Sequence, residues 1–142
     1  MLIGIDSVYD DVVPALNRWR DTGAKIYIYS SGSVPAQKLL FGYSDKGDLL
    51  QYFSGYYDTA VGLKIESQSY RNIAKDIGKE SDPSTILFVS DNVKETTAAQ
   101  QAGFLVAVSD RPGNTPLTEE DRVRFPVVTS FAQIFEHEAF RA

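Results

Sequence analysis

Residues 85–91 read Thr85-Ile86-Leu87-Phe88-Val89-Ser90-Asp91, an apolar run that ends in two polar side chains. A short β-branched and aromatic run of this kind is typical of a strand that is buried on both faces. The alanine-rich residues that follow, from Asp91 or Asn92 to Gln101, predict a helix, and Gly103 ends it. The stretch therefore predicts a buried strand, a polar turn and a helix.

The same alternation continues in both directions along the chain. Helices are predicted over residues 10–21, from residue 34 onwards and over 67–77, with a further turn at 49–53 and a terminal helix capped by Ser130. Strands are predicted at 26–29, 104–108 and 127–129, and a short strand or extended loop at 56–60. Strands that alternate with helices through short loops imply a parallel sheet covered by helices, which is an α/β fold.

Length and composition fit one ordinary domain. The chain has 142 residues and a mass of 15.7 kDa, and 43% of its residues are apolar. Cysteine is absent, which excludes a disulfide scaffold, a thiolate zinc site, a cysteine nucleophile and an iron–sulfur cluster. The single histidine, His137, argues against a histidine-rich metal site and reads as a surface residue.

Charge and hydropathy limit the partners. The 14 basic and 19 acidic residues give a net charge of −5, and no cluster of Lys or Arg stands out, which argues against a nucleic acid partner. No apolar run approaches the roughly 20 residues that cross a bilayer, and Met1 is not followed by a secretory leader. We therefore expect a soluble protein of the cytoplasm, with the nucleus as an alternative compartment and no membrane contact.

Candidate site residues follow the predicted strands, because ligands in open parallel sheets bind beyond the carboxyl ends of the strands. Ser30-Ser31-Gly32-Ser33 leads from a strand into a helix, so its hydroxyls, backbone N–H groups and helix dipole suit a phosphate. Lys64, whose apolar neighbours suggest a partly packed stem, can neutralise phosphate charge. Asp91 can ligate magnesium, and Glu95 lies four residues further on.

Each of these residues also has a simpler structural explanation. Ser30 or Ser31 can form a local turn while Ser33 caps a helix, and Lys64 can be an ordinary solvated lysine. Asp91 can cap the next helix while Glu95 offsets the helix dipole. The segment Arg111-Pro112-Gly113-Asn114 reads most simply as a turn. The residues alone leave these alternatives open.

Taken in order, five segments resemble the enolase-phosphatase (acireductone synthase) branch of the haloacid dehalogenase-like superfamily. They are YIYSSGS at 27–33, AQKLLFG at 36–42, GLKIESQSY at 62–70, LFVSDNVKE at 87–95 and RPGN at 111–114. The resemblance covers the chain from about residue 8 to residue 135. It implies a Rossmann-like, three-layer α/β fold and a magnesium-dependent enzyme of methionine salvage, which converts a phosphorylated methylthio diketopentane to acireductone and phosphate.

The resemblance also implies roles for the candidate residues. Ser30 and Ser31 would contact the substrate phosphate, and Lys64 would stabilise the charge of the phosphoryl group as it is transferred. Asp91 would ligate magnesium, and Glu95 would support the metal through water. The implied partner is a small phosphorylated substrate.

The chain departs from this family at its start. The family opens with a strand that ends in Asp-x-Glu-Gly-Thr, whose Asp is the nucleophile, and a helical cap follows it; neither is present here. Asp6 is the nearest acid after an apolar run, but Val8 stands two residues on and no Gly-Thr follows. We assign no catalytic nucleophile and expect the chain to be inactive or nearly so. A non-catalytic phosphate-binding or regulatory remnant of the same fold is the alternative.

The missing segment matters for the sheet, because the nucleophile strand is central in this superfamily. Its loss leaves two rows of backbone groups unpaired. Residues 2–5 could replace it, the flanking strands could pair directly, a partner chain could fill the gap, or the sequence could be part of a longer enzyme. We favour the last and expect residues 1–142 to form one N-terminally truncated core domain without its central first strand, monomeric unless a partner completes the sheet.

Overall fold

The computed structural model describes residues 2–4, 12–21, 23, 25–30, 33–42, 49–110, 117–129 and 133–134. The strands are β1 (Leu2–Gly4), β2 (Tyr27–Tyr29), β3 (Gly55–Tyr57), β4 (Leu87–Ser90), β5 (Leu105–Ser109) and β6 (Val127–Val128). The α-helices are α1 (Val12–Asp21), α2 (Val34–Gly42), α3 (Ser67–Asp76), α4 (Val93–Gln101) and α5 (Glu119–Arg124). Three short 3₁₀ turns are η1 (Leu50–Tyr52), η2 (Thr59–Val61) and η3 (Pro83–Thr85).

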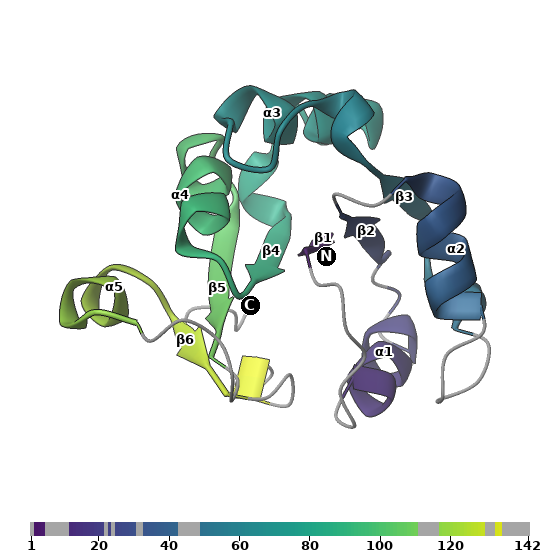
Figure 1. The fold of residues 1–142 in the computed structure, drawn as a ribbon, viewed down its shortest axis with the longest axis horizontal. Coiled ribbons are helices and arrows are strands. Elements are labelled where there is room, and N and C mark those ends of the chain that lie inside the picture. Colours follow the sequence, from purple (N-terminus) through teal and green to yellow (C-terminus); the bar gives the residue numbers. More distant parts are fainter. Residues whose placement is uncertain are drawn as a thin grey trace.

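All described strands belong to one sheet in the order β3-β2-β1-β4-β5-β6, and every neighbouring pair is parallel. Figure 1 shows this order, with β1 between β2 and β4. Parallel neighbours need crossover connections, which the helices between the strands supply. The predicted parallel α/β fold is confirmed.

The expectation that the sheet lacks its central strand was wrong. β1 pairs with β2 on one side and with β4 on the other, so that Ile3 lies beside both Ile28 and Val89. Leu2 and Ile3 are each 1% exposed. The physical reason is that β2 and β4 each present a row of unpaired N–H and C=O groups, which this short apolar strand satisfies. In the sequence, only residues 5–11 separate β1 from α1, where the family that the chain resembles has its cap.

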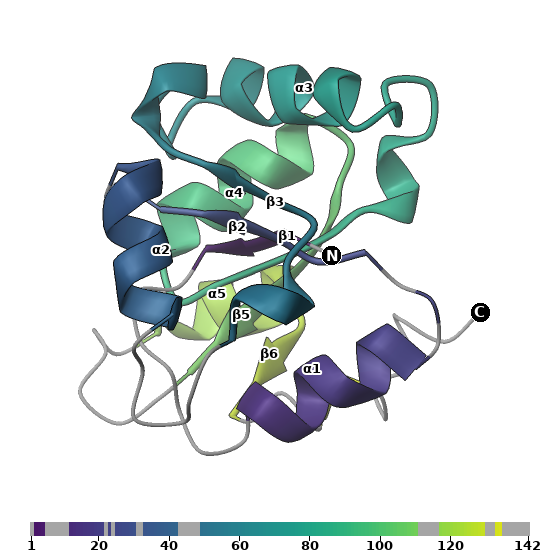
Figure 2. The same cartoon turned by 90° about the vertical axis from the view of Figure 1, so that its right-hand side faces the viewer.

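Side chains alternate between the two faces of the sheet and build a core on each. Ile3, Ile28 and Val89 pack with residues of α1, whereas Leu2, Tyr29 and Phe88 pack with residues of α3 and α4. This alternation follows from the two-residue period of a strand. Figure 2 shows the result, with α3 and α4 on one side of the sheet and α1 on the other. The predicted three-layer arrangement is present.

Most predicted elements are confirmed to within a few residues, but α5 was missed. Thr118 and Asp121 form a capping box, in which the Thr118 hydroxyl accepts from the Asp121 N–H at 3.1 Å and the Asp121 carboxylate accepts from the Thr118 N–H at 3.3 Å. This six-residue helix is stabilised by its caps and has no buried residue, so the apolar periodicity that reveals other helices is absent. Of the predicted terminal helix, residues 133–134 are described and helical, and Ser130 lies outside the described residues.

Replacing Ile3 by alanine tests the central strand. Because Ile3 is buried between β2 and β4, Ile3→Ala should lower the free energy of unfolding by about 2–5 kcal/mol. Urea unfolding followed by circular dichroism measures this change. Val123→Ala on α5 is the matched control, because Val123 is 88% exposed, and it should change stability by no more than about 0.5 kcal/mol. Equal effects of the two variants would show that β1 does not form the centre of the sheet.

Candidate functional site

The carboxyl ends of β1, β2 and β4 meet at one edge of the sheet. Gly4, the last residue of β1, lies in register with Ser90, the last residue of β4. Ser30 follows β2 directly, is 7% exposed, and donates its N–H to the Tyr57 carbonyl at 3.1 Å. Asp91 follows β4 and is exposed. Ser30 and Asp91 therefore lie on either side of the end of the central strand β1, which the sequence analysis had expected to be missing.

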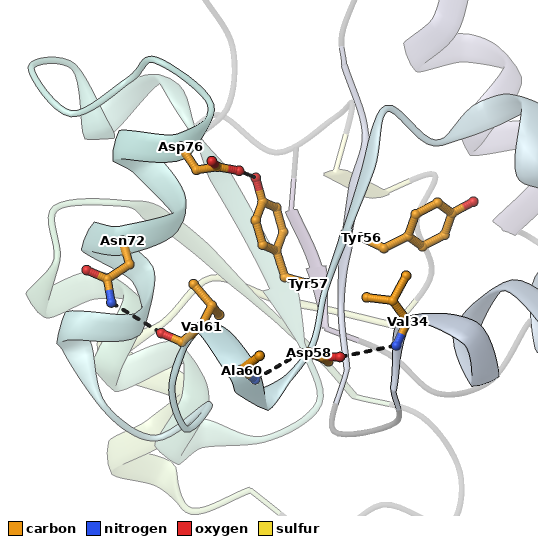
Figure 3. Close-up of a pocket in the computed structure, with 8 residues that line it drawn as sticks. All are labelled: Val34, Tyr56, Tyr57, Asp58, Ala60, Val61, Asn72 and Asp76. Atoms are coloured by element: carbon orange, nitrogen blue, oxygen red, sulfur yellow. Dashed lines mark hydrogen bonds between the residues drawn. The ribbon is translucent and has the colours of Figure 1, made fainter.

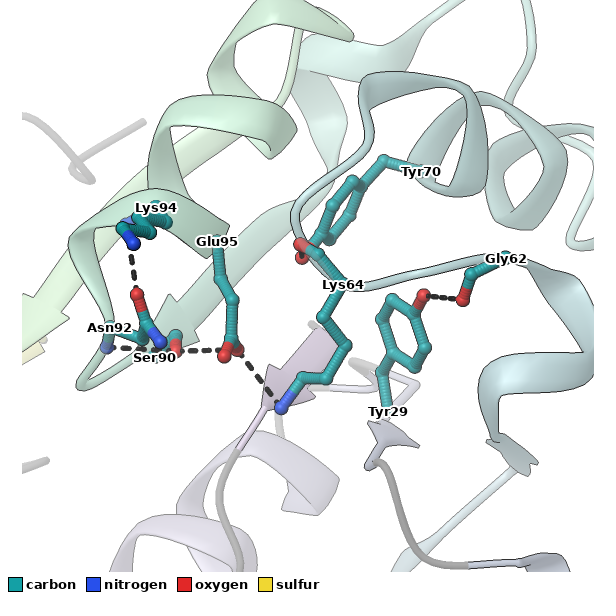
Figure 4. A network of polar contacts seen from close by, with 8 residues as sticks. All are labelled: Tyr29, Gly62, Lys64, Tyr70, Ser90, Asn92, Lys94 and Glu95. Atoms are coloured by element: carbon teal, nitrogen blue, oxygen red, sulfur yellow. Dashed lines mark hydrogen bonds and ion pairs between the residues drawn. The ribbon is translucent and has the colours of Figure 1, made fainter.

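Lys64 forms a buried ion pair with Glu95 (Figure 4). The Lys64 Nζ lies 2.9 Å from the Glu95 Oε1, and each side chain is 11% exposed. The ammonium also lies 5.8 Å from the centre of the Tyr29 ring, within range of a cation–π contact. Lys64 is therefore not an ordinary solvated lysine, and that alternative is excluded. The contact with Glu95 brings together two predicted site residues whose pairing the sequence did not predict.

Ser90 links this ion pair to the loop that carries Asp91. The Ser90 hydroxyl is fully buried; it donates to the Glu95 Oε1 at 2.9 Å and accepts from the Asn92 N–H at 3.1 Å. The Asn92 side chain caps α4 by accepting from the Lys94 N–H at 2.9 Å. Because Asn92 is the cap, capping does not explain Asp91, whose exposed carboxylate stays available for a ligand.

Two buried tyrosines stand beside Lys64. Burial raises the pKa of the Tyr70 hydroxyl far above its ordinary value, and the nearby Glu95 carboxylate raises it further. Burial likewise raises the pKa of Tyr29, and the Glu95 carboxylate adds to the effect. Both hydroxyls therefore remain protonated at neutral pH and act as hydrogen-bond donors.

Several predicted residues lie outside the described residues. Ser31, the second serine of the expected phosphate cradle, is one of them, and Asp6, His137 and the turn at 111–114 are the others. The described part of the site consists of Ser30, Lys64, Asp91 and Glu95. Their placement at one edge agrees with the sequence, and their roles remain predictions.

The described donors do not form a metal cage. Within the described ranges, no group of three or more His, Asp or Glu residues could hold an ion. The Oε1 of Glu95 already contacts Lys64 and Ser90, whereas Asp91 is exposed. Magnesium is often bound by only one or two carboxylates together with substrate phosphate and water. The residues present therefore fit a magnesium ion held jointly by Asp91 and a bound phosphate.

A cavity of about 400 Å³ lies elsewhere, beside the edge strand β3 (Figure 3). The carboxylates that line it already accept hydrogen bonds from the chain itself. Asp58 accepts from the N–H groups of Val34 and Ala60, and Asp76 accepts from the Tyr57 hydroxyl at 2.6 Å. Ser30, Lys64, Asp91 and Glu95 are not among its lining residues. We therefore place the candidate site at the carboxyl ends of the strands and not in this cavity.

Comparisons with known proteins show the family to which this chain belongs. The family model described as "Hydrolase: haloacid dehalogenase-like hydrolase" matches residues 1–103. The chain belongs to the haloacid dehalogenase-like hydrolase family. The resemblance inferred from the motifs is therefore confirmed, and the parallel sheet agrees with this family.

Two curated relatives are both named Enolase-phosphatase E1. The protein of Danio rerio is 58% identical over 127 residues, and that of Branchiostoma floridae is 54% identical over 126 residues. Each alignment covers 89% of this chain but only 48% and 41% of the respective relative. The chain thus spans less than half the length of these relatives.

Among solved structures, the UTR4 protein of Saccharomyces cerevisiae aligns with a TM-score of 0.75 and 39% identity, covering 89% of this chain and 56% of that one. A dehalogenase structure aligns with a TM-score of 0.74 at 20% identity, which supports the fold alone. Within the described part of the chain, no helix is long and apolar enough to cross a membrane.

A double-mutant cycle tests the ion pair. Glu95→Gln should lower the free energy of unfolding by about 2–3 kcal/mol, because it leaves the Lys64 ammonium without its carboxylate. This is below the cost of breaking a fully buried pair, since each side chain retains 11% exposure. Combining Glu95→Gln with Lys64→Met should recover part of the loss in urea unfolding.

The exposed pair of Arg122 and Asp110 is the control for that cycle. Its atoms also lie 2.9 Å apart, but its side chains are 50% and 25% exposed. Arg122→Gln should therefore cost at most about 1 kcal/mol. Additive effects of the Lys64 and Glu95 substitutions would contradict the buried pair.

Proposed function

We propose that this chain binds the phosphate of a small phosphorylated substrate at the carboxyl ends of β2 and β4, as part of an enolase-phosphatase of methionine salvage. In this proposal, Ser30 and Ser31 contact the phosphate and Lys64 supplies the opposing charge. The observation that carries it is the buried Lys64, held at the edge where Ser30 and Asp91 flank the end of β1. The names of the two curated relatives support the reaction and the substrate class.

Lys64 is the positive charge proposed to attract an anion at this edge, in competition with its partner Glu95. A lysine with 11% exposure is poorly screened by water, so a phosphate oxygen beside it gains more than it would at an exposed lysine. Ser30 leads towards the N-terminus of α2, whose helix dipole favours negative charge. The backbone N–H groups of Val34 and Ala36 there already donate to Asp58 and to the Ser33 hydroxyl, so the dipole and not free N–H groups is the contribution of α2. These groups bind and orient a phosphate without any change of protonation.

Magnesium is the proposed cofactor. Asp91 and the substrate phosphate would hold the ion. Glu95, which contacts Lys64 and Ser90, would support the ion through water. When bound, the ion would neutralise charge on the phosphoryl group as it is transferred. We propose the cytoplasm as the compartment of this chemistry.

The missing nucleophile motif favours a second candidate, a phosphate-binding or regulatory role without turnover. The family that the chain resembles ends its central strand in the nucleophilic Asp of Asp-x-Glu-Gly-Thr, whereas no such motif stands in this sequence. Asp6 stands two residues after Gly4, the last residue of β1. A covalent phosphoryl transfer needs a nucleophile, so binding without turnover is the expected behaviour of this chain.

Phosphate binding can be measured by thermal shift. At a phosphate concentration ten times its dissociation constant, with magnesium present, binding should stabilise the chain by about 1.4 kcal/mol, or roughly 3–5 °C in Tm. Lys64→Ala should abolish the shift, whereas Lys79→Ala, at an exposed lysine after α3, should leave it intact. A shift that survives in Lys64→Ala would contradict the proposed site.

Turnover can be measured as magnesium-dependent release of inorganic phosphate. We expect a rate close to the background for the purified chain, because its sequence lacks the Asp-x-Glu-Gly-Thr motif that carries the nucleophile. Robust release that Asp6→Asn abolishes would identify Asp6 as the nucleophile and would overturn the expectation of inactivity.

A further inference from the structure

Three hydroxyl groups hold the loop that carries Lys64. The Tyr29 hydroxyl donates to the Gly62 carbonyl at 2.5 Å, the Ser69 hydroxyl to the Leu63 carbonyl at 2.7 Å, and the Tyr70 hydroxyl to the Lys64 carbonyl at 2.5 Å. The three acceptors are consecutive in the chain, whereas the donors come from β2 and α3. Figure 4 shows both tyrosines beside the Lys64 side chain. Side chains here supply the hydrogen bonds that a strand or helix would otherwise provide.

The donors themselves are fixed by the core. Tyr29 and Tyr70 are fully buried, and Ser69 is 1% exposed. The rings of Tyr29 and Tyr70 meet edge to face with centroids 5.5 Å apart, and the Tyr70 ring also packs against Phe88 at 5.0 Å. These hydroxyls therefore have little freedom to move, and the carbonyls that they hold are fixed relative to the sheet.

Packing of the neighbouring side chains does not explain the position of the loop. Leu63 and Ile65, on either side of Lys64, are 51% and 57% exposed. Gly62 has a φ of 133°, and a Cβ at this position would lie 2.1 Å from the Ser69 Oγ, so the backbone touches α3 directly. The loop is therefore attached to the core through its backbone, while its apolar side chains face solvent.

We propose that Tyr29, Ser69 and Tyr70 are positioning residues, which form a hydroxyl clamp that fixes residues 62–64 and so directs the Lys64 ammonium to Glu95 and to the phosphate site. A lysine needs such a constraint because its four-carbon stem is flexible and its charge has no directional preference. A cation that is already in place binds an anion without first losing conformational freedom. The consequence for ligand binding rests on the proposed function, but the clamp itself can be tested without a ligand.

The test is the reactivity of the Lys64 amine towards acetic anhydride, measured by mass spectrometry relative to Lys79 in the same unliganded molecule. Tyr29→Phe and Tyr70→Phe each remove one hydroxyl and keep the ring. Each should raise the Lys64 to Lys79 ratio roughly fivefold, as expected for the loss of one hydrogen bond that holds the buried state. An unchanged ratio in both folded variants would overturn the proposal.

Tyr57→Phe is the matched control, because it removes a tyrosine hydroxyl that donates to Asp76, beside the cavity at β3. The ratio should stay at the wild-type value in this variant. A purely structural role of the clamp would raise the labelling of Lys64 only through global unfolding, because Lys79 is already exposed. The core variant Ile3→Ala should then raise the ratio at least as much as the tyrosine variants, and that result would count against positioning. Should a tyrosine variant fail to fold, Ser69→Ala removes the third hydroxyl with a smaller change of volume and should raise the ratio in the same direction.

Addition of inorganic phosphate and magnesium separates the clamp from the proposed function. Under the proposed function, phosphate should protect Lys64 from acetylation in the wild-type chain, and the clamp variants should need a roughly fivefold higher concentration for the same protection. If the clamp variants left the Lys64 to Lys79 ratio unchanged while phosphate still protected Lys64, the clamp would be overturned and the proposed function would stand. A raised ratio in the unliganded variants without any protection by phosphate would support the clamp and contradict the proposed function.

Discussion

The candidate site depends on the pairing of one short strand on both of its edges. β1 separates β2 from β4 and holds them parallel and in register, at the spacing of about 4.8 Å that hydrogen-bonded strands require on each side. Ser30 and Asp91 can flank a common ligand only because their strands end on either side of β1. Without this strand, β2 and β4 would each lose a row of hydrogen bonds at the centre of the domain.

Around this frame, the charged residues restrain one another before any ligand binds. Glu95 neutralises Lys64 and accepts a hydrogen bond from Ser90, which in turn accepts from the backbone that follows Asp91. This arrangement keeps a buried ammonium satisfied, and it couples the residue proposed to oppose the phosphate charge to the loop proposed to ligate magnesium. A bound phosphate would compete with Glu95 for the same ammonium, so the pair that orients Lys64 also limits the affinity for the anion.

The sequence predicted the elements well where one local pattern dominates. The apolar run before Ser90 and the alanine-rich segment after it became β4 and α4, and the motif order indicated the superfamily. Sequence reasoning failed where a contact is tertiary or the local signal is weak. The central position of β1 depends on backbone groups that β2 and β4 leave unpaired, and the partner of Lys64 lies on α4, far along the sequence from the loop that carries Lys64. The packed stem of Lys64 was predicted, but from its neighbours Leu63 and Ile65, which are exposed; burial comes from the tertiary contact with Glu95.

The most direct test of this account is a titration of the ¹⁵N-labelled chain with inorganic phosphate in the presence of magnesium, followed by two-dimensional NMR. The account predicts that the amide signals of Ser30, Lys64 and Asn92 shift together along one saturable curve, because these residues surround the end of β1. The signals of Asp58 and Asn72, which line the cavity beside β3, should stay in place. Shifts confined to that cavity, or no saturable shift at Lys64, would contradict the account.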